Sequence, residues 1–298
     1  MRRLILQAAA IAASILAPVE FATAQQARPA TEARTAHISI VEMGSGPPVY
    51  LIPGLASPRA VWDEIAPELA KTHKILLVQV NGFGGDDPGA NLKPGVTDGV
   101  IADVLADAKA RNAGKPAVIG HSYGGLIAMM MAARHPDRIG RVMVVDALPF
   151  IGKIFDPAST PASIEPRAAQ MRTMMAASYD RARAAPVVTA DPGGIWSNNP
   201  DGRIRVANWS SKADARVVAQ AMYEDMVTDI GPELGKVTAR PFTILYAAGV
   251  GEARAKALWE PPFAGTPAKL VAVPDSYHFI MLDQPARFAA EVKAFLAE

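Results

Sequence analysis

A serine between two glycines is the residue of this chain best suited to covalent chemistry. Ser122 stands in Gly120-His121-Ser122-Tyr123-Gly124, between a predicted buried strand at residues 116–119 and a predicted helix that starts near residue 125. A G-x-S-x-G sequence in a strand–turn–helix context places the serine hydroxyl on a sharp, exposed turn. Glycines fit on either side because Cβ atoms there would collide across the turn. We therefore predict that Ser122 is a nucleophile.

A serine hydroxyl is a weak nucleophile until a base takes its proton. Histidine is the usual base near neutral pH, and the chain has five histidines. His121 lies next to Ser122 but is expected to point elsewhere in the turn, so we interpret it as structural. The remaining candidates are His37, His73, His135 and His278.

The composition excludes several other kinds of chemistry. The 298 residues include no cysteine, which removes disulfides, cysteine-ligated zinc, iron–sulfur clusters and thiol nucleophiles together. Lys and Arg number 30 against 29 Asp and Glu, without a basic cluster, so we expect no nucleic-acid partner. Neither a metal-ligand cluster nor a glycine-rich phosphate loop stands out, and we expect no metal and no cofactor.

Predicted strands and helices alternate along most of the chain. Short apolar runs predict strands at residues 37–42, 49–52, 74–80, 116–119, 141–145, 241–246 and 269–273. Apolar residues at helical spacing predict helices at residues 61–69, 99–110, 125–134 and 284–297. This alternation predicts an α/β fold with a mostly parallel central sheet and helices on both faces.

Residues 150–233 interrupt the alternation. They contain no convincing buried strand, but residues 168–177 and 213–227 have helical patterns. We interpret this stretch as a helical cap inserted over the sheet edge; the alternative is a set of ordinary helices packed at the side. The α/β core would then comprise residues 37–149 and 234–298.

The first 24 residues are predicted to be a secretory signal peptide. Arginines near the start precede an apolar run at residues 4–19, and a small-x-small cleavage pattern ends at Ala24. The alternative is an N-terminal anchor, but the run is short for a bilayer span of about 20 residues. Cleavage before Gln25 would leave a periplasmic or secreted protein with no stable membrane span. Residues 25–36 are polar and are expected to form a flexible leader.

Four stretches occur in the order typical of the α/β-hydrolase superfamily. They are Leu51-Ile52-Pro53-Gly54-Leu55, Asn81-Gly82-Phe83-Gly84-Gly85, the pentapeptide around Ser122, and Asp275-Ser276-Tyr277-His278-Phe279. The chain from His37 to Glu298 therefore resembles a capped serine hydrolase of this superfamily. The resemblance implies the α/β-hydrolase fold and a catalytic triad.

The resemblance also assigns roles to residues around Ser122. His278 follows the last predicted strand and a short loop, where members of the superfamily carry the catalytic base. The backbone N–H of Tyr123, directly after the nucleophile, is the first expected oxyanion donor. The second donor matches Leu55, in the loop after the strand at residues 49–52.

The acid that orients His278 has two candidates. The commoner position in the superfamily follows the strand that here ends at Tyr246, where residues 247–251 contain no carboxylate and Glu252 is slightly displaced. Some capped relatives instead place the acid after the strand that follows the nucleophile helix, and Asp146 stands there. An aspartate at that edge can hold the histidine through its Nδ1–H. We favour Asp146 and keep Glu252 as the alternative.

These residues together predict a serine hydrolase that cleaves a carboxylic ester or similar acyl compound through an acyl-enzyme. The same residues would serve lactone, carbon–carbon bond, peptidase-like or haloperoxidase-like activity, because a fold does not fix a substrate. The empty acid position after Tyr246 motivates a different class, a low-turnover ligand-binding sensor. Methionines and aromatic residues within residues 150–233 would suit a hydrophobic acyl substrate, and the alternative is that they form the small core of the cap itself. We expect the partner to be a small molecule with a hydrophobic acyl group.

Overall fold

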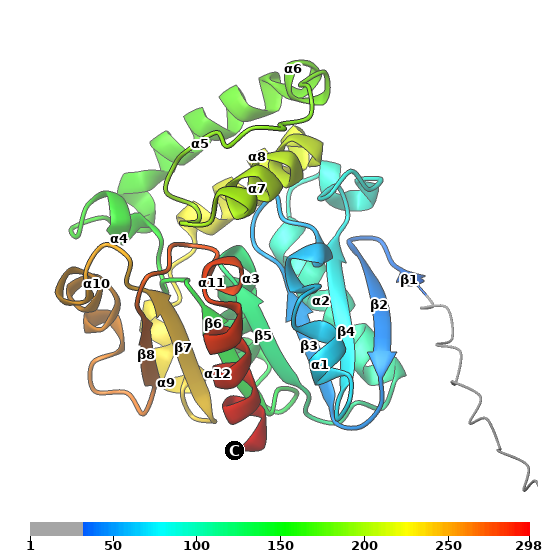
Figure 1. Ribbon diagram of the computed structural model, residues 1–298, viewed down its shortest axis with the longest axis vertical. Coiled ribbons are helices and arrows are strands. Elements are labelled where there is room, and N and C mark those ends of the chain that lie inside the picture. Colours follow the sequence, from blue (N-terminus) through cyan, green and yellow to red (C-terminus); the bar gives the residue numbers. More distant parts are fainter. Residues whose placement is uncertain (1–31) are drawn as a thin grey trace, which may run out of the picture.

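An eight-stranded sheet runs through the middle of the molecule (Figure 1). The computed structural model describes residues 32–298, and the predicted signal peptide lies outside the described residues. The strands are β1 (Glu32–Arg34), β2 (Ile38–Gly44), β3 (Pro48–Ile52), β4 (Lys74–Val80), β5 (Ala117–His121), β6 (Arg141–Val145), β7 (Phe242–Ala247) and β8 (Lys269–Val273). Their order is β1-β2-β4-β3-β5-β6-β7-β8. Only β2 pairs antiparallel with its neighbours, so the mostly parallel sheet is confirmed.

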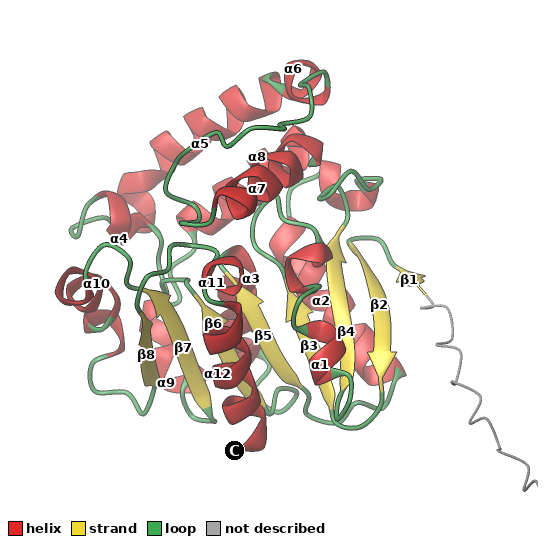
Figure 2. Cartoon of the chain, in the orientation of Figure 1, coloured by secondary structure: helices red, strands yellow, loops and turns green. Residues whose placement is uncertain are grey.

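Helices cover both faces of this sheet (Figure 2). One face carries α1 (Ala66–Leu69), α11 (Ile280–Asp283) and α12 (Pro285–Ala297), and the other carries α2 (Val96–Ala110), α3 (Tyr123–Arg134) and α9 (Leu234–Val237). Helix α10 (Glu252–Trp259) lies near the β7–β8 edge. Short 3₁₀ turns are η1 (Arg59–Trp62), η2 (Gly89–Leu92), η3 (Gly231–Glu233) and η4 (Pro261–Phe263).

The central strands bury side chains on both faces. In β3, Tyr50 and Ile52 pack in the cluster that contains the α2 and α3 residues. Val49 and Leu51 point the other way, into the cluster that contains the α12 residues. Successive side chains of a strand alternate between faces, so a strand covered on both sides reads as a continuous apolar run. This is why these strands were recognisable from short apolar runs.

Five of the helices between β6 and β7 lie over the carboxyl ends of the parallel strands (Figure 1). They are α4 (Gly152–Phe155), α5 (Pro161–Ala177), α6 (Tyr179–Arg183), α7 (Pro200–Lys212) and α8 (Ala215–Val227), and we call them the inserted helices. Helices α5 and α8 pack against each other around a small apolar cluster that includes Ile164, Met222 and Met226. The predicted domain boundaries at residues 150 and 233 stay a prediction.

Several sequence-based expectations differ from the structure. Residues 61–69 form η1 and α1 instead of one helix, because Pro67 lacks an N–H and fits only in the first turn of α1. Helices α7 and α10 were not predicted. Within residues 32–298, no helix is long and apolar enough to cross a membrane.

The expectation of a flexible leader at residues 25–36 is wrong for its described part. Residues 32–34 form β1, which pairs antiparallel with β2. The Glu32 carboxylate also accepts a hydrogen bond from the Arg59 guanidinium at 2.8 Å. Backbone pairing with β2 and this ion pair hold β1 in place. The strand could not be predicted from the sequence, because this short, mostly polar segment shows no apolar pattern. Residues 25–31 lie outside the described residues.

Glu224 of α8 joins the inserted helices to the sheet-covering helices. Its carboxylate accepts hydrogen bonds from the backbone N–H groups of Gly95 at 2.7 Å and Thr97 at 2.8 Å, at the start of α2. The first N–H groups of a helix have no intrahelical partner, so a carboxylate there both pairs them and complements the helix dipole. Glu224 therefore caps α2 from a different part of the chain.

These hydrogen bonds also set the ionisation of Glu224. Burial raises the pKa of its carboxyl, but hydrogen bonds from Gln220, Thr97 and Gly95 outweigh burial and leave that pKa below its ordinary value. The folded-state pKa is thus below the unfolded one. The ionised carboxylate stabilises the fold above the unfolded pKa, and this contribution is lost as pH falls through the folded pKa.

We expect Glu224→Gln to lower the free energy of unfolding by about 1.5–3 kcal/mol at neutral pH, because the start of α2 loses a charged acceptor. Urea denaturation at a series of pH values should show the gap to the native protein shrinking in acid. Glu252→Gln is the control, since Glu252 is exposed and pairs only with Lys256, and its stability should match the native protein. Equal losses in both variants would contradict the capping role.

Candidate active site

Ser122 occupies the turn between β5 and α3. Its backbone has φ 53° and ψ −122°, a left-handed conformation that is strained for a residue with a side chain. The Ser122 N–H donates to the Val145 carbonyl at 2.9 Å, and the Ser122 carbonyl accepts from the N–H of Gly125 at 2.7 Å. Neighbouring strand and helix therefore hold the turn from both sides.

Gly120 and Gly124 have no room for a side chain, as the sequence indicated. A Cβ atom at Gly120 would overlap the carbonyl of Gly124. A Cβ atom at Gly124 would overlap the carbonyls of Ile52 and Pro53, in the loop after β3. The start of α3 thus lies directly against that loop, and no larger residue fits either position.

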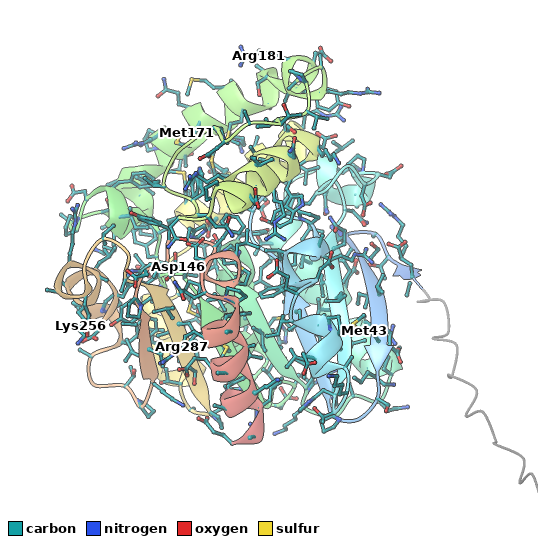
Figure 3. All side chains as sticks on the ribbon, viewed as in Figure 1. Met43, Asp146, Met171, Arg181, Lys256 and Arg287 are labelled. Carbon is teal, nitrogen blue, oxygen red and sulfur yellow. The ribbon has the colours of Figure 1, made fainter. Side chains whose placement is uncertain are left out.

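His278 and Asp146 are brought together at the carboxyl edge of the sheet. His278 Nδ1 and Asp146 Oδ2 are 2.7 Å apart. The other carboxylate oxygen, Oδ1, accepts the N–H of Ala247 at 2.8 Å, so both oxygens of Asp146 have partners. Asp146 is only 6% exposed, and Figure 3 shows it beneath the inserted helices. A buried carboxylate in this arrangement can fix the histidine ring and stabilise its protonated form.

The two candidate acids lie in different places. Asp146 follows β6 and is bonded to His278. Glu252 starts α10, its side chain is 60% exposed, and it pairs with Lys256 at 2.6 Å. The structure therefore brings Asp146, and not Glu252, to His278.

His121 supports the loop that carries His278. Its ring is fully buried, and burial lowers the pKa of its imidazole well below the ordinary value. A neutral ring donates only one proton, and Nε2 lies 2.9 Å from the His278 carbonyl oxygen, so the proton is on Nε2. The rings of His121 and His278 are 4.7 Å apart between centroids. His121 is therefore a positioning residue, in agreement with its structural interpretation from the sequence.

The hydroxyl of Ser122 makes no hydrogen bond to His278 among the described residues. The two residues are neighbours through His121, which precedes Ser122 and contacts the His278 ring. Catalytic hydrogen bonds commonly form only when substrate binds.

Two backbone N–H groups beside Ser122 have no acceptor among the described residues. One belongs to Tyr123, the first residue of α3, where no intrahelical acceptor exists. The other belongs to Leu55, in the loop after β3. This loop is adjacent to the nucleophile, since a Cβ atom at Gly54 would lie 3.0 Å from the Ser122 Cβ. Such donors can stabilise negative charge on a substrate oxygen.

Backbone strain gathers at this edge of the sheet. Five described residues other than glycine have positive φ, namely Ala56, Asn112, Ser122, Asp146 and Asp275. Four of them follow the ends of β3, β5, β6 and β8, and only Asn112 lies elsewhere, after α2. A strained backbone conformation persists only where the neighbouring structure holds it in place, and such residues are common at functional sites.

The His278 loop is held by Asp283 and by residues just before α7, and none of these was predicted from the sequence. The Asp283 carboxylate accepts the N–H of Tyr277 at 2.7 Å and that of Asn198 at 3.1 Å, and also the hydroxyl of Ser197. The centroids of the Trp196 and His278 rings are 5.5 Å apart, in an edge-on arrangement. Residues 196–198 are distant in sequence from His278 and Asp283, so no local pattern could reveal their contacts.

Asp225 of α8 was also missed. It is 9% exposed, and burial raises the pKa of the Asp225 carboxyl, with a smaller opposing electrostatic interaction with His278. A carboxylate within the apolar pattern of residues 213–227 was a signal available in the sequence. Among residues 32–298, no group of three or more His, Cys, Asp or Glu is placed to hold a metal ion.

Curated relatives of this chain include proteins named as esterases. The pimeloyl-(acyl-carrier protein) methyl ester esterase of Chromobacterium violaceum is 27% identical over 232 residues, which are 70% of this chain and 88% of that protein. The enzyme of the same name from Aeromonas hydrophila is 29% identical over 115 residues, 38% of this chain. That second match spans only 42% of the relative.

The fold is shared with solved structures and with a family. A thermophilic esterase from Thermogutta terrifontis superposes with a TM-score of 0.69 at 21% identity, covering 90% of this chain and 98% of that one. At that identity the likeness establishes the fold. A family model for the alpha/beta hydrolase fold matches residues 47–285, the range that contains β3 to β8 and the Ser122 turn. The chain therefore belongs to the alpha/beta hydrolase fold family.

Proposed function

We propose that this protein is a serine esterase that cleaves a carboxylic ester through an acyl-enzyme. The observation that carries the proposal is the 2.7 Å hydrogen bond between His278 and Asp146, beside a serine in a strained strand-to-helix turn. A nucleophile, a histidine and a buried carboxylate in this arrangement are the parts that acyl transfer needs. The esterase relatives support the same reaction class.

In the proposed first step, Ser122 Oγ attacks the ester carbonyl while His278 Nε2 takes the hydroxyl proton. Nε2 is the ring nitrogen available for this, because Nδ1 faces Asp146. The Asp146 carboxylate keeps the ring in place and stabilises the imidazolium. His278 then gives the proton to the leaving alcohol oxygen, which breaks the ester bond and leaves the acyl group on Ser122.

In the proposed second step, a water molecule attacks the acyl-enzyme with His278 again as base. Its hydroxyl becomes part of the released carboxylic acid, and the proton returns to Ser122 Oγ. In both steps, the N–H groups of Tyr123 and Leu55 stabilise the oxyanion. The absence of an internal acceptor for either group supports this role.

We propose that the inserted helices form a cap over this site and that the acyl group is small and hydrophobic. Leu55, one of the two oxyanion donors, packs against the cluster that contains Met222 and Met226. Apolar side chains of the inserted helices would therefore lie next to the ester carbonyl. Methionines adapt to irregular apolar groups, which suits an acyl chain of this kind.

We also propose that the protein is exported to the periplasm or secreted. The support is the charged start, the apolar run at residues 4–19 and the small-x-small pattern that ends at Ala24.

The nucleophile is tested with a fluorophosphonate probe, which reacts with an activated serine. We expect the native protein to be labelled on Ser122 and Ser122→Ala to be unlabelled. Hydrolysis of short p-nitrophenyl esters should fall in Ser122→Ala by about 10³-fold or more, because only oxyanion stabilisation and binding remain. A native protein that is neither labelled nor active would favour a ligand-binding sensor instead.

The two candidate acids are separated by isosteric amides. Asp146→Asn is expected to lower kcat by about 10³–10⁴-fold, since the amide favours the wrong histidine tautomer. Glu252→Gln should keep native kcat, because Glu252 is exposed and bonded to Lys256. Both variants are assayed with one ester at saturating concentration, and thermal unfolding confirms folding. Loss of activity in Glu252→Gln alone would refute the assignment of Asp146.

Export is tested by recovering the protein from the periplasm and medium of an expressing bacterium and sequencing its N-terminus. The expected first residue is Gln25. Recovery of a chain that still begins at Met1 would contradict the signal peptide.

A further inference from the structure

One carboxyl group of the inserted helices is buried without a partner. Asp225 is 9% exposed, and among the described residues its carboxylate makes no hydrogen bond and no ion pair. Other carboxylates of this segment are paired: Asp214 binds Arg216 at 2.7 Å, and Glu224 binds the start of α2. Burying a polar group without a partner costs free energy. Asp225 therefore destabilises the ligand-free protein.

The side chain of Asp225 continues a stripe that faces the sheet. Ala221 and Val218, one and two helical turns before it, belong to the apolar cluster that contains the α3 residues. Positions three and four apart share a face of a helix, so Asp225 points the same way. Its unpartnered oxygens are not fully sealed from solvent, so a polar group of a small ligand can reach them.

The end of α8 is tied to the catalytic edge. The Ile230 N–H, three residues after α8, donates to the Pro149 carbonyl at 3.0 Å. Pro149 lies in the loop that begins at Asp146, whose carboxylate holds His278. Asp225 and His278 are close enough for their charges to interact, and Asp225 also interacts electrostatically with Tyr123. Asp225 is thus within electrostatic range of the reacting groups, on a helix whose Met222 and Met226 belong to the apolar cluster against which Leu55 packs.

The chemistry of the carboxyl indicates which ligand group would bind to it. Burial raises the pKa of Asp225 to about 7. A poorly solvated carboxyl is stabilised most by a hydrogen-bond donor that approaches it in a water-poor site. Hydroxyl and ammonium groups supply such donors, whereas a plain alkyl chain would leave the carboxyl unsatisfied and would pay its full desolvation penalty.

We propose that Asp225 is a specificity-determining residue that accepts a hydrogen bond from a hydroxyl or ammonium group of the substrate, close to its scissile carbonyl. The inference rests on the proposed esterase function and refines it, from a wholly apolar substrate to one that carries a polar donor beside its ester. Asp225 takes no proton from the reacting atoms. Its contribution is to bind the correct substrate and to disfavour the apolar one.

The test compares two pairs of esters that differ only by a hydroxyl in place of a methyl group. The first pair, ethyl 3-hydroxybutanoate and ethyl 3-methylbutanoate, varies the acyl side. The second, 2-hydroxyethyl butanoate and propyl butanoate, varies the alcohol side. We expect the native enzyme to favour the hydroxylated member of at least one pair in kcat/KM. In Asp225→Leu, this preference should fall by about tenfold or more, because a site built for a hydrogen bond discriminates strongly against its absence.

A second readout separates recognition from a structural role. Asp225→Leu should hydrolyse the apolar ester of that pair faster than the native enzyme does, and its Tm should be equal or higher. Asp225→Asn, which keeps an acceptor without charge, should retain part of the preference. Asp180→Asn, an exposed aspartate of α6, is the matched control and should keep the native ratio. An unchanged ratio in Asp225→Leu for both pairs would overturn the proposal.

A binding measurement tests the role of Asp225 independently of whether the protein is an esterase. Thermal shifts are recorded for Ser122→Ala, with and without Asp225→Leu, in the presence of each ester. A larger shift with the hydroxylated ester that disappears in the double variant supports Asp225, even if the native protein hydrolyses neither pair. If the thermal shift of Ser122→Ala is the same for both esters of each pair, or if neither ester causes a shift, the result counts against the inference. Absence of fluorophosphonate labelling, by contrast, counts only against the esterase proposal.

Discussion

The whole site depends on crowding at the turn between β5 and α3. Carbonyl groups of Gly124 and Ile52 occupy the positions where side chains of Gly120 and Gly124 would stand. The backbone can reverse there only if both residues lack a Cβ atom, and the residue between them must adopt positive φ. One steric constraint therefore presents the Ser122 hydroxyl, places the first N–H of α3 beside it and presses the helix against the loop that carries Leu55.

The order of strands supplies the remaining partners. Asp146 directly follows β6, and His278 follows β8, with β7 between the two strands in the sheet. The N–H of Ala247 at the end of β7 donates to one oxygen of Asp146, which leaves the other oxygen for His278. Because parallel strands end at the same edge, three separate segments contribute to one hydrogen-bonded group. The strained backbone at each strand end is held by these neighbours.

Two adjacent carboxylates of α8 behave in opposite ways. Glu224 is satisfied by the start of α2 and fixes the inserted helices to the core. Asp225, the next residue, points to a different face and has no partner among the described residues. A helix turns about 100° per residue, so neighbouring side chains meet different surroundings. The first carboxylate accordingly stabilises the fold, whereas the second destabilises it in a position where a ligand can compensate.

The sequence by itself determined the strand positions, the mostly parallel sheet and the nucleophile turn, because each depends on a local pattern. Continuous apolar runs mark strands buried on two faces, and Gly120 and Gly124 mark a crowded turn. It also narrowed the acid to Asp146 or Glu252. Only the tertiary structure brought Asp146, and not Glu252, to His278, since that contact depends on how β6 and β8 lie in space. The contacts of Asp283 with Ser197 and Asn198 and the burial of Asp225 were likewise decided by segments far apart in the chain, whose meeting no local spacing encodes.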